Sequence, residues 1–231
     1  GEFKNGEFIS GTLKYFNVTV MTGEFINLLL CGKGKTELKC GTIDEGVFEN
    51  SLLVEGKRTF TDGRFSEGKY DKNGSLTHGT SKHKGQVDTG DFKNGVMHGK
   101  GRVEYDVNFD TEQNVIIAGE GEFQNGQMNG KGKIWYANGD VVEGEFINNE
   151  RHGDITITYA NGDVWSGKYN RGRKTGTSTV ITTHKYKQFW ENGSLLYDGD
   201  FYQYLADRAN ILLPTLAGML LLRKFMNPRV D

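Results

Sequence analysis

Cysteine is scarce in this sequence of 231 residues, which contains only Cys31 and Cys40. Two cysteines are too few for a disulfide scaffold or a zinc site, so neither is expected to organise the fold. Cys31 directly precedes a glycine, as His98 and His152 do, which favours a packing role over a reactive thiol. This cysteine usage fits a reducing cytoplasmic setting better than secretion.

Excess charge of one sign is also missing. The sequence has 28 basic and 30 acidic residues, a formal net charge of −2. Nucleic-acid binding needs clustered Lys and Arg, and no run of these two residues is longer than two. We therefore expect no nucleic-acid partner, and only weak charge-driven binding to anionic lipid.

Signatures of catalysis are absent as well. The sequence has no His-Glu-x-x-His, Cys-x-x-Cys or Gly-x-Ser-x-Gly pattern. His78, His98 and His152 each precede a glycine at what looks like one repeat position, which favours an architectural role. We therefore expect a protein that is not an enzyme and that needs neither a metal nor a cofactor.

Glycine, in contrast, is abundant, with 33 residues, and many of these glycines begin a Gly-x-aromatic triplet. The triplets start at Gly1, Gly23, Gly46, Gly68, Gly90, Gly121, Gly144, Gly167 and Gly199. Six of the steps between them are 22 or 23 residues and two are 31 and 32, which indicates a repeat architecture. Asn-Gly turn signals separate segments of alternating polarity, so each copy is predicted to be two short antiparallel strands.

The glycines themselves predict how the sheet packs. Glycine weakens a strand unless something needs the missing side chain. We expect the aromatic rings to lie over bare glycine backbone on neighbouring strands, with the Gly-x-Gly pairs at 32–34, 99–101 and 130–132 doing the same on the opposing strands. The Phe column is then interpreted as a thin core.

The fullest copies, residues 90–101 (GDFKNGVMHGKG) and 121–132 (GEFQNGQMNGKG), resemble MORN (membrane occupation and recognition nexus) repeats. The copies at 144–153 and 167–176 share the resemblance, which spans residues 1–201 in about nine copies, the last partial. It implies an all-β fold, an elongated, single-layer, twisted antiparallel sheet of β-hairpins that acts as a binding or tethering module.

The first four copies depart from the family pattern. One or more glycines are displaced or replaced there, at Ser10, Leu28, Ser51 and Gly74. We therefore expect less regular packing in the N-terminal half. Because the chain begins at Gly1, within a copy, we also expect it to be a fragment of a longer protein.

A partner is expected to bind along rows of aromatic side chains, as the resemblance implies. Tyr and Trp combine an apolar ring with a polar group and suit half-exposed surfaces. The predicted partner-binding groove consists of Tyr105, Trp135, Tyr136, Tyr159, Trp165 and Tyr169. An amphipathic helix or an extended peptide would fit such a groove.

Two insertions lengthen the repeat and are expected to form loops, one within 106–118 and one within 182–190. Loops on a rigid scaffold often carry function. The second has exposed aromatic candidates for an interaction loop, namely His184, Tyr186, Phe189 and Trp190. Neutral surface decoration is the alternative.

Residues 202–231 break the pattern and are predicted to form a short apolar α-helical segment. Its proposed contact residues are Leu205, Leu212, Leu216, Met219 and Leu220. Three interpretations remain open: a cap on the sheet end, a helix for a partner or for homo-oligomer formation, and an interfacial membrane helix. The uncharged stretch of 14 residues, 209–222, is too short to span a bilayer.

These observations favour a cytoplasmic scaffold or adaptor that binds a partner protein and tethers it to a membrane or cytoskeletal structure. A direct phospholipid-binding module is one alternative. The other is an accessory repeat region cut from a larger enzyme, because the resemblance includes proteins in which such repeats precede a phosphoinositide kinase or a lysine methyltransferase domain.

Overall fold

The structure, a computed structural model, describes residues 1–15, 19–106, 115–182, 187–191 and 194–199. Every helix or strand within these ranges is a β-strand, and the predicted C-terminal helical cap lies outside them. The chain divides into two compact units by the contacts within each. Unit 1 comprises residues 1–138 and 146–149; unit 2 comprises residues 139–145 and those from 150 onward.

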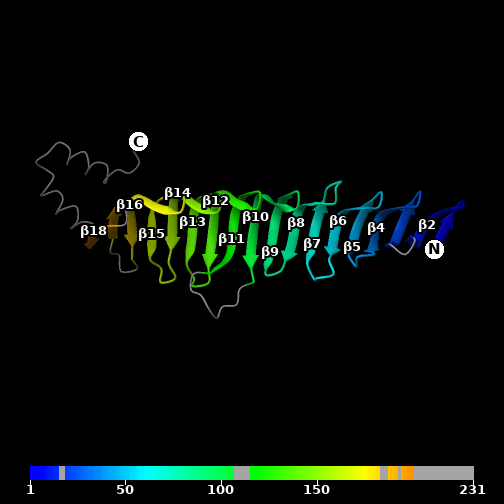
Figure 1. The fold of residues 1–231 in the computed structure, drawn as a ribbon, viewed down its shortest axis with the longest axis horizontal. Helices are drawn as coiled ribbons and strands as arrows, with labels where there is room; N and C mark the ends of the chain where they lie inside the picture. The colour runs from blue at the N-terminus through cyan, green and yellow to red at the C-terminus, as the bar shows by residue number, and fades with distance from the viewer. Residues whose placement is uncertain (16–18, 107–114, 183–186, 192–193, 200–231) are drawn as a thin grey trace, which may run out of the picture. The chain divides into compact units, whose positions relative to one another are not determined.

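Unit 1 is a single layer of strands in chain order, each antiparallel to the next (Figure 1). The strands are β1 (Glu2–Lys4), β2 (Glu7–Tyr15), β3 (Thr19–Ile26), β4 (Leu29–Leu38), β5 (Ile43–Glu49), β6 (Leu52–Thr59), β7 (Phe65–Tyr70), β8 (Leu76–His83), β9 (Gln86–Lys93), β10 (Val96–Tyr105), β11 (Ile116–Gln124) and β12 (Gln127–Tyr136). The all-β, antiparallel hairpin prediction is confirmed for this unit.

Unit 2 continues with hairpins of the same kind. Its strands are the first part of β13 (Val141–Ile147), then β14 (Glu150–Thr158), β15 (Val164–Asn170), β16 (Arg173–Ile181), β17 (Lys187–Glu191) and β18 (Ser194–Gly199). From β14 onward each strand pairs antiparallel with the next.

The predicted interaction loop at 182–190 is wrong for its second half. Phe189 and Trp190 lie on β17, which is paired on both sides, whereas His184 and Tyr186 lie outside the described residues. The segment 190–193 reads aromatic-x-Asn-Gly, as residues 92–95 do, and this is the signal for a strand that runs into a turn. Gln188 stands where a triplet would have glycine, which hid this copy from the triplet pattern.

A ladder of glycines crosses unit 1, with one glycine from every strand from β2 to β12. Each ladder glycine between the first and the last lies directly opposite the ladder glycines on both neighbouring strands, and the two end members, Gly11 and Gly132, lie opposite Gly23 and Gly121. The ladder residues are Gly11, Gly23, Gly34, Gly46, Gly56, Gly68, Gly79, Gly90, Gly101, Gly121 and Gly132. In unit 2 the corresponding row reads Ile155, Gly167 and Ser178, so the ladder is a property of unit 1.

The ladder glycines are needed because the paired backbones approach closely. A Cβ added to Gly46 would lie 2.6 Å from the Cα of Gly56, and the reverse substitution meets the same distance. The expected cover by aromatic rings of neighbouring strands is wrong at Gly11, because the Phe8 ring that lies there belongs to the same strand, β2. It is also wrong at Gly101 and Gly132, where Met97 and Met128 of the same strands lie over the glycine.

The first glycine of each Gly-x-Gly pair has a different role from the one expected. Gly32, Gly99 and Gly130 have φ values of 79°, 103° and 111° and lie where the strand register shifts. Each faces the acidic residue of a triplet, as Gly99 faces Asp91. The Asp91 carboxylate accepts a hydrogen bond from the Lys100 backbone N–H at 3.2 Å, so the acid of the triplet ties down the bulge.

The three histidines thought equivalent do not share one position. His78 precedes Gly79, which belongs to the ladder, whereas His98 precedes the bulge glycine Gly99. His78 therefore corresponds to Lys100, and its Nδ1 hydrogen-bonds the Asp91 carboxylate at 2.9 Å.

The less regular packing expected in the first four copies is not seen in the strand register, since the ladder is unbroken there. The substituted turn residues Leu28 and Ser51 both adopt a φ of 65°. Ser51 Oγ accepts a hydrogen bond from the Leu30 N–H at 3.0 Å and so ties its turn to the preceding hairpin. A side-chain hydrogen bond thus replaces the conformational freedom of glycine at this turn.

The core of unit 1 is thin and consists mainly of one aromatic and one aliphatic side chain from each copy after the first, in which the triplet residue Phe3 is 68% exposed. Its buried residues include Phe25, Leu30, Phe48, Leu53, Tyr70, Leu76, Phe92, Met97, Phe123, Met128 and Phe146. The prediction that the Phe column is a thin core is confirmed for Phe25, Phe48, Phe92, Phe123 and Phe146, and is wrong for the exposed Phe3. All of these side chains belong to one face of the sheet, because alternate residues of a strand point to opposite faces.

Candidate functional site

A groove of about 510 Å³ lies on the core face of unit 1, over strands β9 to β12. Its floor is formed by buried apolar side chains, namely Met97, Val103, Phe123, Met128 and Ile134. Val96, Tyr105 and Ile116 line it and remain exposed, with Tyr105 at 40%. The volume is in the range of sites that bind small molecules or side chains.

One part of the groove is polar. Asp88 also lines it and is only 7% exposed. The Gln86 side-chain amide donates a hydrogen bond to Asp88 Oδ1 at 2.7 Å. The nearest cationic candidate is His83, whose Nε2 lies 3.8 Å from Asp88 Oδ2, too far for a hydrogen bond. Burial first, and the Asp88 charge second, raise the pKa of Tyr105. The negative charge of Asp88 therefore influences a side chain that lines the groove.

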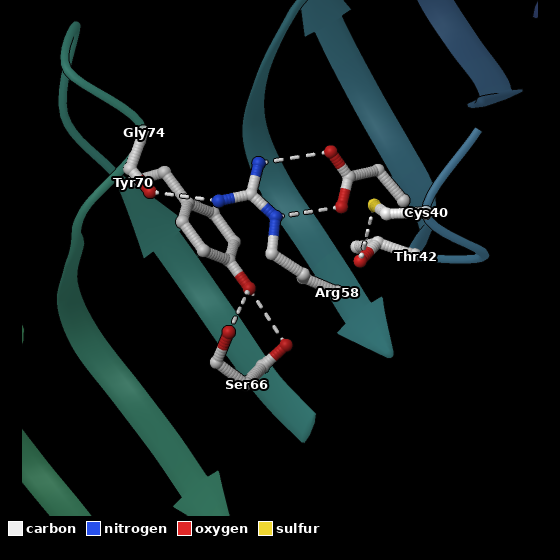
Figure 2. A network of polar contacts seen from close by, with 7 residues as sticks. Cys40, Thr42, Arg58, Ser66, Tyr70 and Gly74 are labelled. Carbon is white, nitrogen blue, oxygen red and sulfur yellow. Dashed lines mark hydrogen bonds and ion pairs between the residues drawn. The ribbon is translucent and has the colours of Figure 1, made fainter. Parts of the chain in front are cut away.

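A second buried aspartate, Asp44, lies on β5, and both of its carboxylate oxygens accept hydrogen bonds from a cationic side chain (Figure 2). Arg58 donates two hydrogen bonds to the Asp44 carboxylate, from Nε to Oδ1 at 2.7 Å and from Nη2 to Oδ2 at 2.8 Å. Its third nitrogen, Nη1, donates to the Gly74 carbonyl at 2.9 Å, and its guanidinium carbon lies 5.5 Å from the Tyr70 ring centroid. The Tyr70 hydroxyl in turn donates to the Ser66 carbonyl at 2.6 Å.

The structure separates the predicted groove residues of unit 1 onto two faces. Tyr105 lines the groove, and Tyr136, half-buried, projects to the same face as Ile134. Trp135 projects to the opposite face, where the Arg102 guanidinium lies 4.8 Å and the Lys133 ammonium 5.5 Å from its ring. A single partner segment in the groove would therefore contact Tyr105 and leave Trp135 on the far side of the sheet.

In unit 2, Trp165 and Tyr169 are 3% and 5% exposed and belong to the core, with Tyr159 half-buried. The Arg151 guanidinium lies 5.4 Å from the Tyr169 ring and donates to its hydroxyl at 3.2 Å. The Lys174 ammonium lies 4.4 Å from the Trp165 ring, and burial, with a smaller effect of Arg151, lowers the pKa of this lysine.

These basic side chains were missed from the sequence, although a signal was present. Met97 and Met128 stand five residues after the aromatic of their triplets, and Arg151 and Lys174 stand five residues after theirs. An alignment of the copies would therefore have shown that unit 2 has a basic residue at the position where these two copies of unit 1 have a buried methionine.

Among the described residues, no group of His, Cys, Asp and Glu side chains gathers in a way that could hold a metal ion. None of them forms a helix long and apolar enough to cross a membrane. The arrangement is suited to recognition, because apolar side chains and one buried carboxylate converge on an open hollow.

The Tyr70 network leads to a prediction about alkaline pH. Burial raises the pKa of Tyr70 above 10.0, opposed by its hydrogen bond with Ser66 and the nearby Arg58. A raised pKa favours the protonated phenol in the folded state, so this stability is present below pH 10 and is lost as the pH rises through the folded pKa. Burial also raises the pKa of Tyr105 and Tyr159.

We therefore expect the free energy of unfolding to fall as the pH is raised above about 10, and to fall less steeply in Tyr70→Phe. Urea unfolding followed by circular dichroism across this range measures the slope. Tyr15→Phe, at an exposed tyrosine, is the control and should behave like the parent chain. Equal slopes in Tyr70→Phe and the parent chain would contradict the role given to Tyr70.

Comparison with known proteins shows that three segments of the chain match the family model of the MORN repeat, residues 89–106, 120–141 and 143–164. No curated protein matches the chain. Among solved structures, the wild-type TCP10 domain of Danio rerio CPAP is similar at 11% identity, with 82% of this chain and 99% of that chain covered and a TM-score of 0.30.

The same domain in complex with a peptide of Danio rerio STIL is similar at 13% identity, with 82% and 93% of the chains covered and a TM-score of 0.26.

Proposed function

We propose, from the premise that this chain is a MORN-repeat protein, that it is a non-catalytic scaffold or adaptor that holds a segment of a partner protein in the groove of unit 1. The observation that carries the proposal is the groove itself, an apolar hollow on a sheet face with exposed Val96, Tyr105 and Ile116 beside it. Such side chains gain stability when a partner removes them from water.

A peptide or helix suits this groove because the apolar floor of the groove extends across several strands. The apolar floor side chains come from three neighbouring strands, β10, β11 and β12, so they form a surface and not a single point of contact. A partner that presents side chains at regular intervals can occupy several of these positions at once. Tyr105 offers a ring for packing and a hydroxyl for hydrogen bonding, which is common at protein interfaces.

The groove can be tested by site-specific photo-crosslinking. A photoreactive phenylalanine analogue at position 105 is expected to crosslink the chain to one or a few polypeptides in cells. The same analogue at position 135, on the opposite face, is the matched control and should give none of these products. Mass spectrometry of the adducts identifies the partner. Identical products at both positions, or no polypeptide adduct at position 105, would contradict the proposal.

Membrane or cytoskeletal placement, and self-association, are the parts of the proposal that depend on residues 202–231. Vesicle flotation of the full chain and of a version that ends at Phe201, with neutral and with acidic lipids, tests the membrane part. Flotation of the full chain alone would support lipid binding through that segment. The alternative of an accessory region of a larger enzyme is decided by the full-length gene product.

A further inference from the structure

We infer that the partner segment places an arginine or lysine side chain in the groove, where it pairs with the buried carboxylate of Asp88, and that apolar residues flank this side chain. The inference rests on the function proposed above and refines it by naming the chemistry of the partner. It comes from a comparison of two sites within this chain, one filled and one open.

Asp44 and Asp88 occupy the same position in their copies. Each stands two residues before a ladder glycine, Gly46 and Gly90. Each is buried, at 6% and 7% exposure, on the first strand of its hairpin. The residue directly opposite on the next strand is Arg58 for Asp44 and Val103 for Asp88.

The remaining walls of the two sites also correspond. The triplet aromatic on the strand after next is Tyr70 at the first site and Phe123 at the second. The second site therefore keeps the carboxylate and the ring but has a short apolar side chain where the first has its cation.

The nearest arginine in the sequence does not fill the second site. Arg102 precedes Val103, and its side chain lies on the opposite face of the sheet, where it binds Glu104 at 2.8 Å and Glu120 at 3.2 Å. Arg102 lies on the other face because successive residues of a strand point to opposite faces, and Val103, not Arg102, is the residue opposite Asp88. Within the described part of the chain, the Gln86 amide hydrogen-bonds Asp88 and the His83 ring lies farther away.

A buried carboxylate in this situation favours a cationic ligand. Burying a charge costs free energy unless it is paired and hydrogen-bonded. A guanidinium or ammonium group would form a charge-assisted hydrogen bond with Asp88. The Phe123 ring can interact with such a cation as the Tyr70 ring does with Arg58. The flexible side chains of Met97 and Met128 adapt to apolar residues on either side of the cation.

The inference can be tested with peptides selected from a random displayed library against the intact chain. Selected peptides are expected to share an Arg or Lys flanked by apolar residues. Replacing that residue with uncharged citrulline or glutamine should weaken binding at least about tenfold, roughly 1.4 kcal/mol. Asp88→Asn should weaken binding of the parent peptide similarly and make the peptide substitution nearly neutral. Asp154→Asn, an exposed carboxylate that does not line the groove, is the charge-matched control.

A second variant keeps the test decisive if Asp88→Asn is poorly folded. Val103→Arg places an arginine opposite Asp88, as Arg58 stands opposite Asp44, and should occupy the groove from within. This variant should remain folded and lose peptide binding at least about tenfold. Binding equal to that of the parent chain would overturn the inference.

The two proposals fail in different ways. Selected peptides without a basic residue, or with an affinity that Asp88→Asn does not change, would refute the cation pairing even if they compete for the groove. Peptides that bind without reducing crosslinking of the partner to the photoreactive analogue at position 105 would instead count against the groove as the partner site. A second copy of the chain as occupant would appear as self-association that Val103→Arg abolishes.

Discussion

Replacing Gly90 with alanine is expected to lower the free energy of unfolding of unit 1 by about 3 kcal/mol. A Cβ at this position would lie 2.5 Å from the Cα of Gly101 and closer still to the Lys100 carbonyl oxygen. Gly90 also has a φ of 139°, which an L-residue rarely adopts. Both atoms that the Cβ would meet, the Gly101 Cα and the Lys100 carbonyl oxygen, belong to the backbone. No side-chain rotation can therefore relieve the clash, and the paired strands must separate.

Urea unfolding measures this loss, and hydrogen exchange of strands β9 and β10 locates it. Gly126→Asn is the control, because Gly126 lies in a turn at a φ of 79° with no atom within 4 Å of an added Cβ. Asparagine already occupies the corresponding turn position at Asn149, with a φ of 68°. The control should cost less than about 1 kcal/mol. A Gly90→Ala variant as stable as Gly126→Asn would show that the ladder does not require glycine.

Breaking the Asp44–Arg58 pair should produce the second large effect. Asp44→Ala is expected to lower the free energy of unfolding by about 2 kcal/mol, less than the roughly 3–5 kcal/mol typical of breaking a fully buried pair. The loss is smaller because the Arg58 side chain is partly exposed and keeps its hydrogen bond to the Gly74 carbonyl. The loss arises because the substitution leaves a half-buried guanidinium without its counter-ion.

The matched control is Asp62→Ala, which removes an aspartate that also pairs with an arginine, Arg64 at 2.6 Å, but at an exposed turn. Exposed pairs contribute at most about 1 kcal/mol. Thermal and urea unfolding of both variants give the comparison, and a double variant with Arg58→Met tests the coupling. Equal losses at the two sites would mean that burial does not strengthen the Asp44–Arg58 pair.

Much of the fold could be predicted from repeated local signals. The triplets and the Asn-Gly turns correctly indicated antiparallel hairpins and a thin core containing Phe92 and Phe123, because a strand period and a turn type are properties of a few adjacent residues. The prediction failed where one copy lacked a single signal. Gln188 in place of the triplet glycine made β17 look like a loop, although the aromatic-x-Asn-Gly pattern of 190–193 was intact.

The candidate site was harder to predict. Tyr105 was predicted from its column to bind the partner, and the structure places it at the wall of the groove. Asp88 was missed because a single aspartate in a strand looks like any solvated charge, and only the pairing of β9 with β10 shows that it is buried opposite Val103. Trp135 was grouped with Tyr136, but neighbours in a strand face opposite sides.

The sequence alone determined the hairpins, their order and the row of aromatic side chains, because each depends on spacing along the chain. Only the tertiary structure decided which glycines meet across strands, and which charged side chains are paired within the sheet. Arg58 and Arg102 stand fourteen residues after Asp44 and Asp88 respectively. The first pairs with its aspartate and the second does not, because the register of each hairpin sets the face on which a side chain lies.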